Sequence, residues 1–132
     1  MKSIDLTERI IGAAIAVHRE LGPGFLESIY EEAFCIALAD SGLRFSRQLP
    51  VPILFRGRPV GEHRLDVVVE EAIVVELKAV TEIHDIHFAT LRSYLKATGS
   101  DHGLILNFAG PTLAIRRVGR EWHSRLQGRN QA

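Results

Sequence analysis

Two acidic residues and a lysine with spacing suited to phosphoryl chemistry occur in one apolar segment of the chain. Asp66, Glu76 and Lys78 lie within residues 64–78, which read RLDVVVEEAIVVELK. Carboxylate oxygens are ligands for Mg²⁺, which takes one or two of them and fills its other positions with waters and phosphate oxygens. A nearby lysine could orient an attacking water or stabilise charge that develops on a phosphoryl group. The three residues therefore indicate a metal-assisted site, provided that the fold brings them together.

Alternation of apolar and polar residues predicts that this segment is a β-hairpin with a three-residue turn at 70–72. A two-residue turn would set polar positions against apolar ones, because a register slip moves every side chain to the other face. The expected opposed pairs are Val69–Ile73, Val67–Val75, Leu65–Leu77, Asp66–Glu76 and Arg64–Lys78. Opposed carboxylates lie about 4.5–5.5 Å apart at Cβ and repel each other. A raised pKa, Lys78 or a divalent cation could offset that repulsion, whereas ordinary cross-strand salt bridges on a solvent-facing hairpin are the alternative.

Glu27 is the third candidate acid. Tyr30, Phe34 and Leu38 follow it by three, seven and eleven residues, so that Glu27 continues the inward stripe of an expected helix. Its place in the first turn also favours the ionised carboxylate through the helix dipole. A role limited to complementing the dipole remains the alternative.

The remaining pattern predicts a mixed-sheet α/β (α+β) domain in which helices flank a central sheet. Pro50 and Pro52 lack N–H groups on the same edge of their strand, which predicts an outer strand on that side. Expected helices cover residues 5–21, 26–40 and 83–97, and expected strands cover 45–55, 58–69, 73–80, 103–108 and 113–118.

Composition indicates one globular domain. The chain has 132 residues, of which 46% are hydrophobic and 24% charged, with one cysteine and a net charge of zero. No apolar run approaches the ~20 residues needed to cross a bilayer, so we expect a cytoplasmic protein without membrane contact. We expect one domain over residues 1–118 and a basic tail over 119–132. Arg116, Arg117 and Arg120, at the end of the domain and in the tail, are either solvated residues or phosphate contacts.

The motifs together resemble a known family. Residues 24–30 read GFLESIY and fit the GxxExxY motif, while Asp66, Glu76 and Lys78 fit the acidic-acidic-lysine core of PD-(D/E)xK nucleases. The resemblance to GxxExxY proteins extends over about residues 10–117. It includes the segments 22–24, 64–66, 75–79 and 106–108.

This resemblance implies a restriction-endonuclease-like core and a metal-dependent nuclease acting on nucleic acid, with DNA favoured over RNA. Glu27, Asp66 and Glu76 would hold Mg²⁺ or Mn²⁺, and Lys78 would assist the attacking water. Supporting positions would be Tyr30, Arg64, His87, Thr90 and Tyr94. Related nucleases often have glutamine where this chain has Thr90, and Asp66 is not preceded by proline. A nuclease-fold module that binds nucleic acid or protein without efficient catalysis is the alternative, and assembly into homodimers stays open.

Two other signals carry less weight. His84 and His87 could share one helix face, but zinc needs at least a third ligand. Cys35 has no neighbouring base in the sequence, which predicts a buried thiol in the second helix.

Overall fold

The structure, a computed structural model, describes residues 3–119, which form three helices and five strands. All expected elements are present, with ends that differ from the predictions by a few residues at most. The elements in chain order are α1 (Ser3–Leu21), α2 (Glu27–Asp40), β1 (Phe45–Phe55), β2 (Arg58–Val69), β3 (Ile73–Lys78), α3 (Asp85–Thr98), β4 (His102–Asn107) and β5 (Ala114–Gly119).

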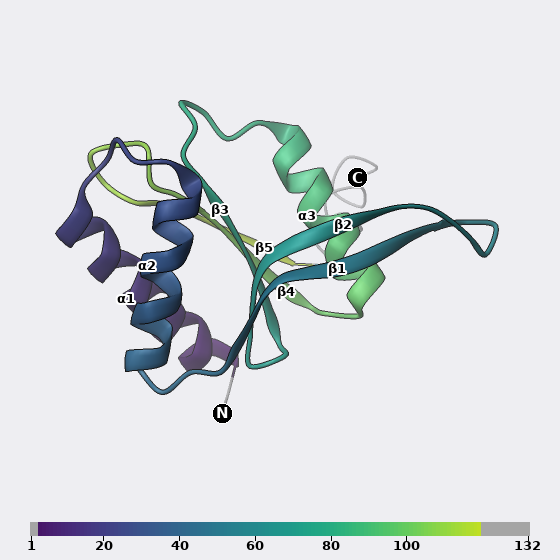
Figure 1. Cartoon of the computed structure of the whole chain (residues 1–132), viewed down its shortest axis with the longest axis horizontal. Coiled ribbons are helices and arrows are strands. Elements are labelled where there is room, and N and C mark those ends of the chain that lie inside the picture. Colours follow the sequence, from purple (N-terminus) through teal and green to yellow (C-terminus); the bar gives the residue numbers. More distant parts are fainter. Residues whose placement is uncertain (1–2, 120–132) are drawn as a thin grey trace, which may run out of the picture.

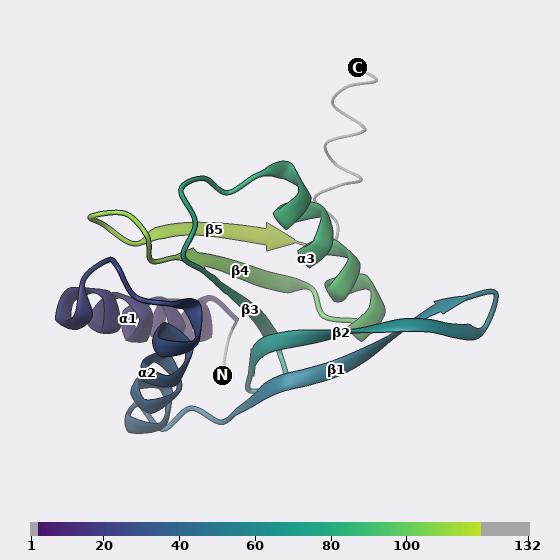
Figure 2. The ribbon, with the colours of Figure 1, turned by 45° about the horizontal axis from the view of Figure 1, so that its top comes forward.

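The five strands form one mixed sheet in the order β1-β2-β3-β4-β5. Every neighbouring pair is antiparallel except β3 and β4, which are parallel and connected through α3. The edge position predicted for β1 from Pro50 and Pro52 is confirmed. Helices α1 and α2 cover one face of the sheet and α3 covers the other, as Figures 1 and 2 show. The architecture is therefore the expected α+β sheet flanked by helices.

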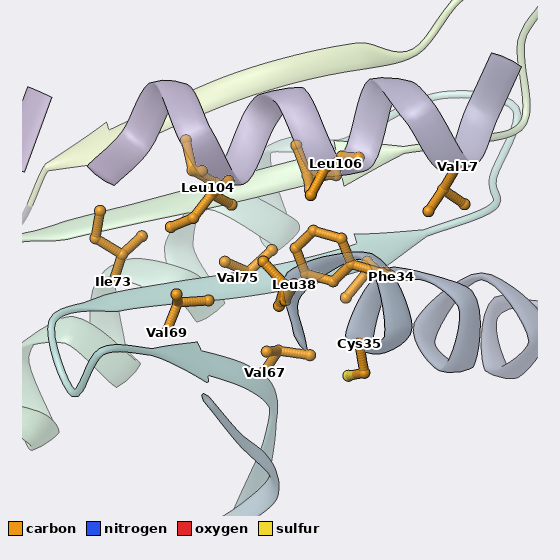
Figure 3. Close-up of a cluster of buried hydrophobic side chains, with 14 of the residues drawn as sticks. Val17, Phe34, Cys35, Leu38, Val67, Val69, Ile73, Val75, Leu104 and Leu106 are labelled. Atoms are coloured by element: carbon orange, nitrogen blue, oxygen red, sulfur yellow. The ribbon is translucent and has the colours of Figure 1, made fainter. Parts of the chain in front are cut away.

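Two apolar clusters fill the space between the sheet and its helices. The first lies under α1 and α2 (Figure 3) and contains Phe34, Leu38, Val67, Val75 and Leu106, among others. The second lies under α3 and is built from the opposite faces of the same strands. The thiol of Cys35 belongs to the first cluster, and burial raises its pKa to about 11, which confirms the expected buried cysteine.

The predicted hairpin register is confirmed over three pairs and fails beyond them. Val67 pairs with Val75 and Val69 with Ile73 around a turn at 70–72. Leu65 and Leu77 were expected on one face, but Leu65 lies in the α3 cluster and Leu77 in the α1–α2 cluster. That expectation was wrong.

The reason for the failed pairing lies in a local irregularity of the β1–β2 ladder. Paired residues lie on either side of Gln48 and Asp66, but these two do not pair, and Gln48 has a φ of 50°. The β2 side chains change faces across this interruption, from Val67 in the cluster under α1 and α2 to Leu65 in the cluster under α3.

Among the described residues, no helix is long and apolar enough to span a bilayer. Of the expected tail, Gly119 ends β5, and residues 120–132 lie outside the described part of the chain.

Candidate active site

The candidate site forms where β2 separates from β3. Instead of a backbone pair opposite β3, the Asp66 side chain accepts a hydrogen bond from the Leu77 N–H at 2.9 Å. Leu77 lies between Glu76 and Lys78, so this bond holds Asp66 beside both of them. Burial raises the pKa of Asp66, while the Leu77 N–H and the Lys78 charge oppose that rise.

Glu76 is a buried acid with an unsatisfied oxygen. Its exposed fraction is 8%, and its Oε1 has no hydrogen-bond partner. Burial and, next, the charge of Asp66 raise the pKa of Glu76 to about 8, although Lys78 acts in the other direction. A buried charged oxygen without a partner is unfavourable. Glu76 therefore favours its protonated form near neutral pH unless a cation joins the site.

The end of β3, which carries Lys78, is fixed from β4. The Phe108 N–H donates to the Lys78 carbonyl at 2.8 Å. Asn107, buried beside Lys78 in the parallel ladder, bonds the backbone of Val80 twice: its Oδ1 accepts from the N–H at 3.1 Å and its Nδ2 donates to the carbonyl at 2.9 Å. Asn107 was not predicted from the sequence to position the site. The available signal was a polar residue directly after the apolar run Leu104–Leu106.

Glu27 reaches this strand end from the start of α2. Its Oε1 accepts a hydrogen bond from the Ala79 N–H, the residue after Lys78, at 3.1 Å. Its side chain is exposed, yet its charge acts on both Asp66 and His87. Glu27 therefore lies at the end of the strand that carries Glu76 and Lys78.

Tyr30 positions the loop that precedes Glu27. Its hydroxyl donates to the Gly22 carbonyl at 2.6 Å and accepts from the Phe25 N–H at 3.2 Å. Its ring stacks on Phe108, with ring centroids 4.5 Å apart. Tyr30 thus ties the loop before α2 to the β4 end, and its hydroxyl is engaged by backbone groups of that loop.

Glu31 is an additional acid that sequence reasoning missed. Although only 8% exposed, it is held by Arg47 at 3.0 Å and by Gln48 at 2.8 Å. Its charge raises the pKa of Asp66. The signal was its position four residues after Glu27, which places both acids on one helix face.

Helix α3 covers the site from the other side. His87 is half-buried; burial, followed by the charge of Lys78, lowers its pKa, and its Nδ1 accepts the His84 N–H at 3.0 Å. Tyr94 is buried with its ring centroid 4.9 Å from that of His63. The pKa of Tyr94 is raised by burial and by the charges of Glu76 and Asp66. Thr90 lies half-buried one turn before it.

The predicted arginines lie outside this group. Arg64 is exposed, lies opposite Pro50 on β1 and contacts Glu62 at 3.5 Å, so its expected position opposite Lys78 was wrong because β2 has left β3 there. Arg116 and Arg117 are exposed on β5, and Arg120 lies outside the described residues. Arg116 falls in the same cross-strand row as Ile105 and Glu76. Strand spacing puts it roughly 10 Å from Glu76.

The carboxylate oxygens of Asp66 and Glu76 suit a divalent cation that takes only some of its ligands from the protein. Asp66 and Glu76 offer hard oxygen ligands, and the unpartnered Oε1 of Glu76 leaves a ligand position unused. Within residues 3–119, no three histidine, cysteine or acidic side chains are close enough to enclose a metal. Two carboxylates completed by waters and a phosphate oxygen are nevertheless a common Mg²⁺ arrangement.

Comparison with known proteins agrees with this geometry. A family model of the PD-(D/E)XK nuclease superfamily matches residues 4–118. The chain belongs to this superfamily, whose nucleases generally use divalent metals and act on nucleic acid. No curated protein matches the sequence.

Among solved structures, the crystal structure of SSO0001 matches with a TM-score of 0.53 and 16% identity. The match covers 70% of this chain and 48% of SSO0001, so the chain spans about half the length of that protein. At this identity the match supports the restriction-endonuclease-like fold alone.

Proposed function

We propose that this protein is a metal-dependent nuclease that hydrolyses phosphodiester bonds of nucleic acid, with DNA preferred over RNA. The observation that carries the proposal is the buried Glu76 carboxyl. Its unpartnered oxygen lies beside Asp66 and on the same strand as Lys78, in a chain of the PD-(D/E)XK superfamily. A purely structural acid at this position would be expected to have a hydrogen-bond partner for each buried oxygen.

Asp66 and Glu76 are the proposed ligands of Mg²⁺ or Mn²⁺, and Glu27 is the third candidate ligand. The bound cation would supply Lewis-acid activation of a phosphoryl oxygen and of water. Asp66 is oriented by the Leu77 N–H, and Glu27 by the Ala79 N–H. Glu76 would release its proton when it becomes a ligand, because only the carboxylate binds a cation well.

Lys78 is the proposed catalytic lysine. It follows Glu76 by two residues and is half-buried, and its ammonium charge acts on Asp66 and Glu76. From there the ammonium can hold the attacking water or donate to the phosphoryl oxygen that gains charge in the transition state. The Phe108 and Asn107 contacts fix the strand end that carries it. His87, Thr90 and Tyr94 would line the substrate side of the site from α3.

Cleavage assays on duplex DNA, single-stranded DNA and RNA test the proposal. We expect cutting with Mn²⁺ or Mg²⁺, none with chelator, and a loss of about 100-fold or more in Lys78→Ala. Lys96→Ala, which removes an exposed lysine from the last turn of α3, is the matched control and should cut normally. Equal cutting by Lys78→Ala and the wild type would place the activity elsewhere.

The alternative is a nuclease-fold module without efficient catalysis, and Thr90 in place of the usual glutamine is the observation that favours it. Divalent-cation binding without cleavage of any tested substrate would support this alternative. We further propose that the chain is a GxxExxY protein, based on residues 24–30. A cytoplasmic location and a single domain over residues 1–118 followed by a basic tail complete the proposal.

A further inference from the structure

The outer halves of β1 and β2 form a projecting β-ribbon, residues 49–64, which we call the arm. Figures 1 and 2 show it extending away from the sheet beyond α3. From Pro52 to Arg64, all side chains except that of Ile53 are exposed. The arm therefore adds little to the apolar core, and a ribbon of this length requires another explanation.

The root of the arm is anchored to the body of the protein. Val51 is buried in the cluster under α3, with an exposed fraction of 6%. His63 packs its ring against Tyr94 of α3, 4.9 Å away between centroids. These contacts give the arm a defined direction relative to the candidate site.

The tip of the arm is cationic and apolar. The tip, residues 54–60, contains two arginines and no acidic residue. Arg56 lies over the Phe55 ring at 5.0 Å, and within residues 3–119 no ion pair engages Arg56 or Arg58. Leu54, Phe55 and Val60 are each more than half exposed. Phosphates with adjacent base edges complement such a surface, because arginine binds phosphate or guanine and apolar groups contact thymine methyls.

Strand pairing with a second copy fits the β1 edge of the arm poorly. Pro50 and Pro52 remove two N–H groups from the outer edge of β1, and prolines on an edge strand oppose edge-to-edge association. The arm's shape instead matches a duplex groove. A two-stranded β-ribbon fits the major groove of B-form DNA, which is about 12 Å wide. The major groove of A-form RNA is too deep and narrow for side chains to read.

The arm is continuous with the candidate site. Arg58 and Asp66 lie on the same strand, eight residues apart, which corresponds to a reach of roughly 26 Å. At about 3.4 Å per base pair, the tip would contact a duplex about eight base pairs from the scissile phosphate.

We propose that the arm is a DNA-duplex-binding element whose tip enters the major groove about eight base pairs from the site of cleavage, with Arg56 and Arg58 as its main contacts. This inference rests on the proposed nuclease function for its substrate class. It goes further by assigning duplex recognition to a part of the chain outside the carboxylate site.

The test is equilibrium binding of the full-length protein in chelator to a labelled 20-base-pair DNA duplex and to an RNA duplex of the same sequence. Arg56→Ala and Arg58→Ala are compared with Arg19→Ala, which removes one exposed positive charge from α1, on the other side of the molecule. We expect each tip variant to bind DNA about fivefold to tenfold more weakly than the wild type. The slope of log binding constant against log salt concentration should become smaller by about one. The affinity of the tip variants for the RNA duplex should change little. The affinity of Arg19→Ala for the DNA duplex should also change little.

Several results would overturn the inference: unchanged DNA binding by the tip variants, an equal loss in Arg19→Ala, or an equal loss on DNA and RNA. A change of oligomeric state in the tip variants without a change in DNA affinity would instead show that the arm joins copies of the chain.

Cleavage is a separate readout. Arm-dependent DNA binding without cleavage would contradict the nuclease proposal alone, whereas cleavage by a protein whose tip variants bind DNA normally would contradict the arm proposal alone.

Discussion

The Asp66 carboxylate accepts the Leu77 backbone N–H at 2.9 Å at the point where β2 leaves β3. This side chain takes the place of a strand-to-strand backbone bond. One interaction thereby satisfies a backbone donor and holds an acid next to Glu76 and Lys78. The separation of the two strands thus forms the candidate site.

This relationship predicts opposite effects for two substitutions of Asp66. Asp66→Asn keeps an oxygen that can accept the Leu77 N–H and removes the charge that faces Glu76. In chelator its free energy of unfolding should equal that of the wild type or exceed it by up to about 1 kcal/mol. Asp66→Ala leaves the N–H without that partner and should lower stability by about 1–3 kcal/mol.

Urea unfolding with and without Mn²⁺ measures both effects. Mn²⁺ should stabilise the wild type through mass action and stabilise Asp66→Asn much less. A clear loss of stability in Asp66→Asn, together with no Mn²⁺ effect on either protein, would contradict the metal site.

The raised pKa of Glu76 predicts a pH dependence of stability. In the folded protein this pKa is about 8, against an ordinary value of 4.5, so the folded state holds the proton more tightly. The resulting stabilisation is complete below about pH 4.5 and is lost as the pH rises through about 8. Without metal, the wild type should match Glu76→Gln at about pH 4 and be less stable at about pH 9, by up to a few kcal/mol.

Unfolding at several pH values in chelator gives this difference directly, and a constant difference between the two proteins would contradict a raised pKa. Cation binding at pH 7 should also release close to one proton. Calorimetry in two buffers with different ionisation enthalpies measures that proton.

Asn107 is predicted to support activity by fixing the strand end that carries Lys78. Asn107→Ala removes the bonds to both backbone groups of Val80 and should lower the unfolding free energy by about 1–3 kcal/mol. It should also reduce kcat at temperatures where the variant remains folded. Asn107→Asp retains the acceptor for the Val80 N–H and should recover part of both losses.

Ser93→Ala is the control, since its hydroxyl makes only an exposed bond to the Ala89 carbonyl. Full activity in a folded Asn107→Ala variant would show that the strand end needs no support from β4.

Arg47 is predicted to contribute more to the free energy of unfolding than its exposed position on β1 indicates. It contacts both Glu31 and Glu32, and Glu31 is buried. Arg47→Ala leaves that acid without its cation and should lower the unfolding free energy by about 1–3 kcal/mol. Arg47→Lys should be intermediate, because lysine keeps the charge but lacks the planar fork.

Arg44→Ala is the comparison, since Arg44 forms an exposed ion pair with Glu70 and its loss should change stability little. Equal effects of the two alanine substitutions would contradict a special role for the Glu31–Arg47 pair.

The sequence by itself determined the elements, the central register of the hairpin and the identity of the hairpin acids. These features depend on local periodicity: Val67, Val69, Ile73 and Val75 alternate with a period of two, and only one register puts them all on a buried face. The prolines of β1 likewise identify an edge strand from chemistry alone, because a missing N–H cannot be supplied by neighbours.

Only the tertiary structure decided how those residues meet. The separation of β2 from β3 beyond Val67 places Leu65 under α3 and Arg64 on the arm. It also allows the Asp66 carboxylate to reach the Leu77 N–H. Glu31 and Asn107 join the site through contacts between residues 16 to 27 positions apart in the chain. Local periodicity cannot specify such contacts, because twist and long-range packing determine which side chains meet.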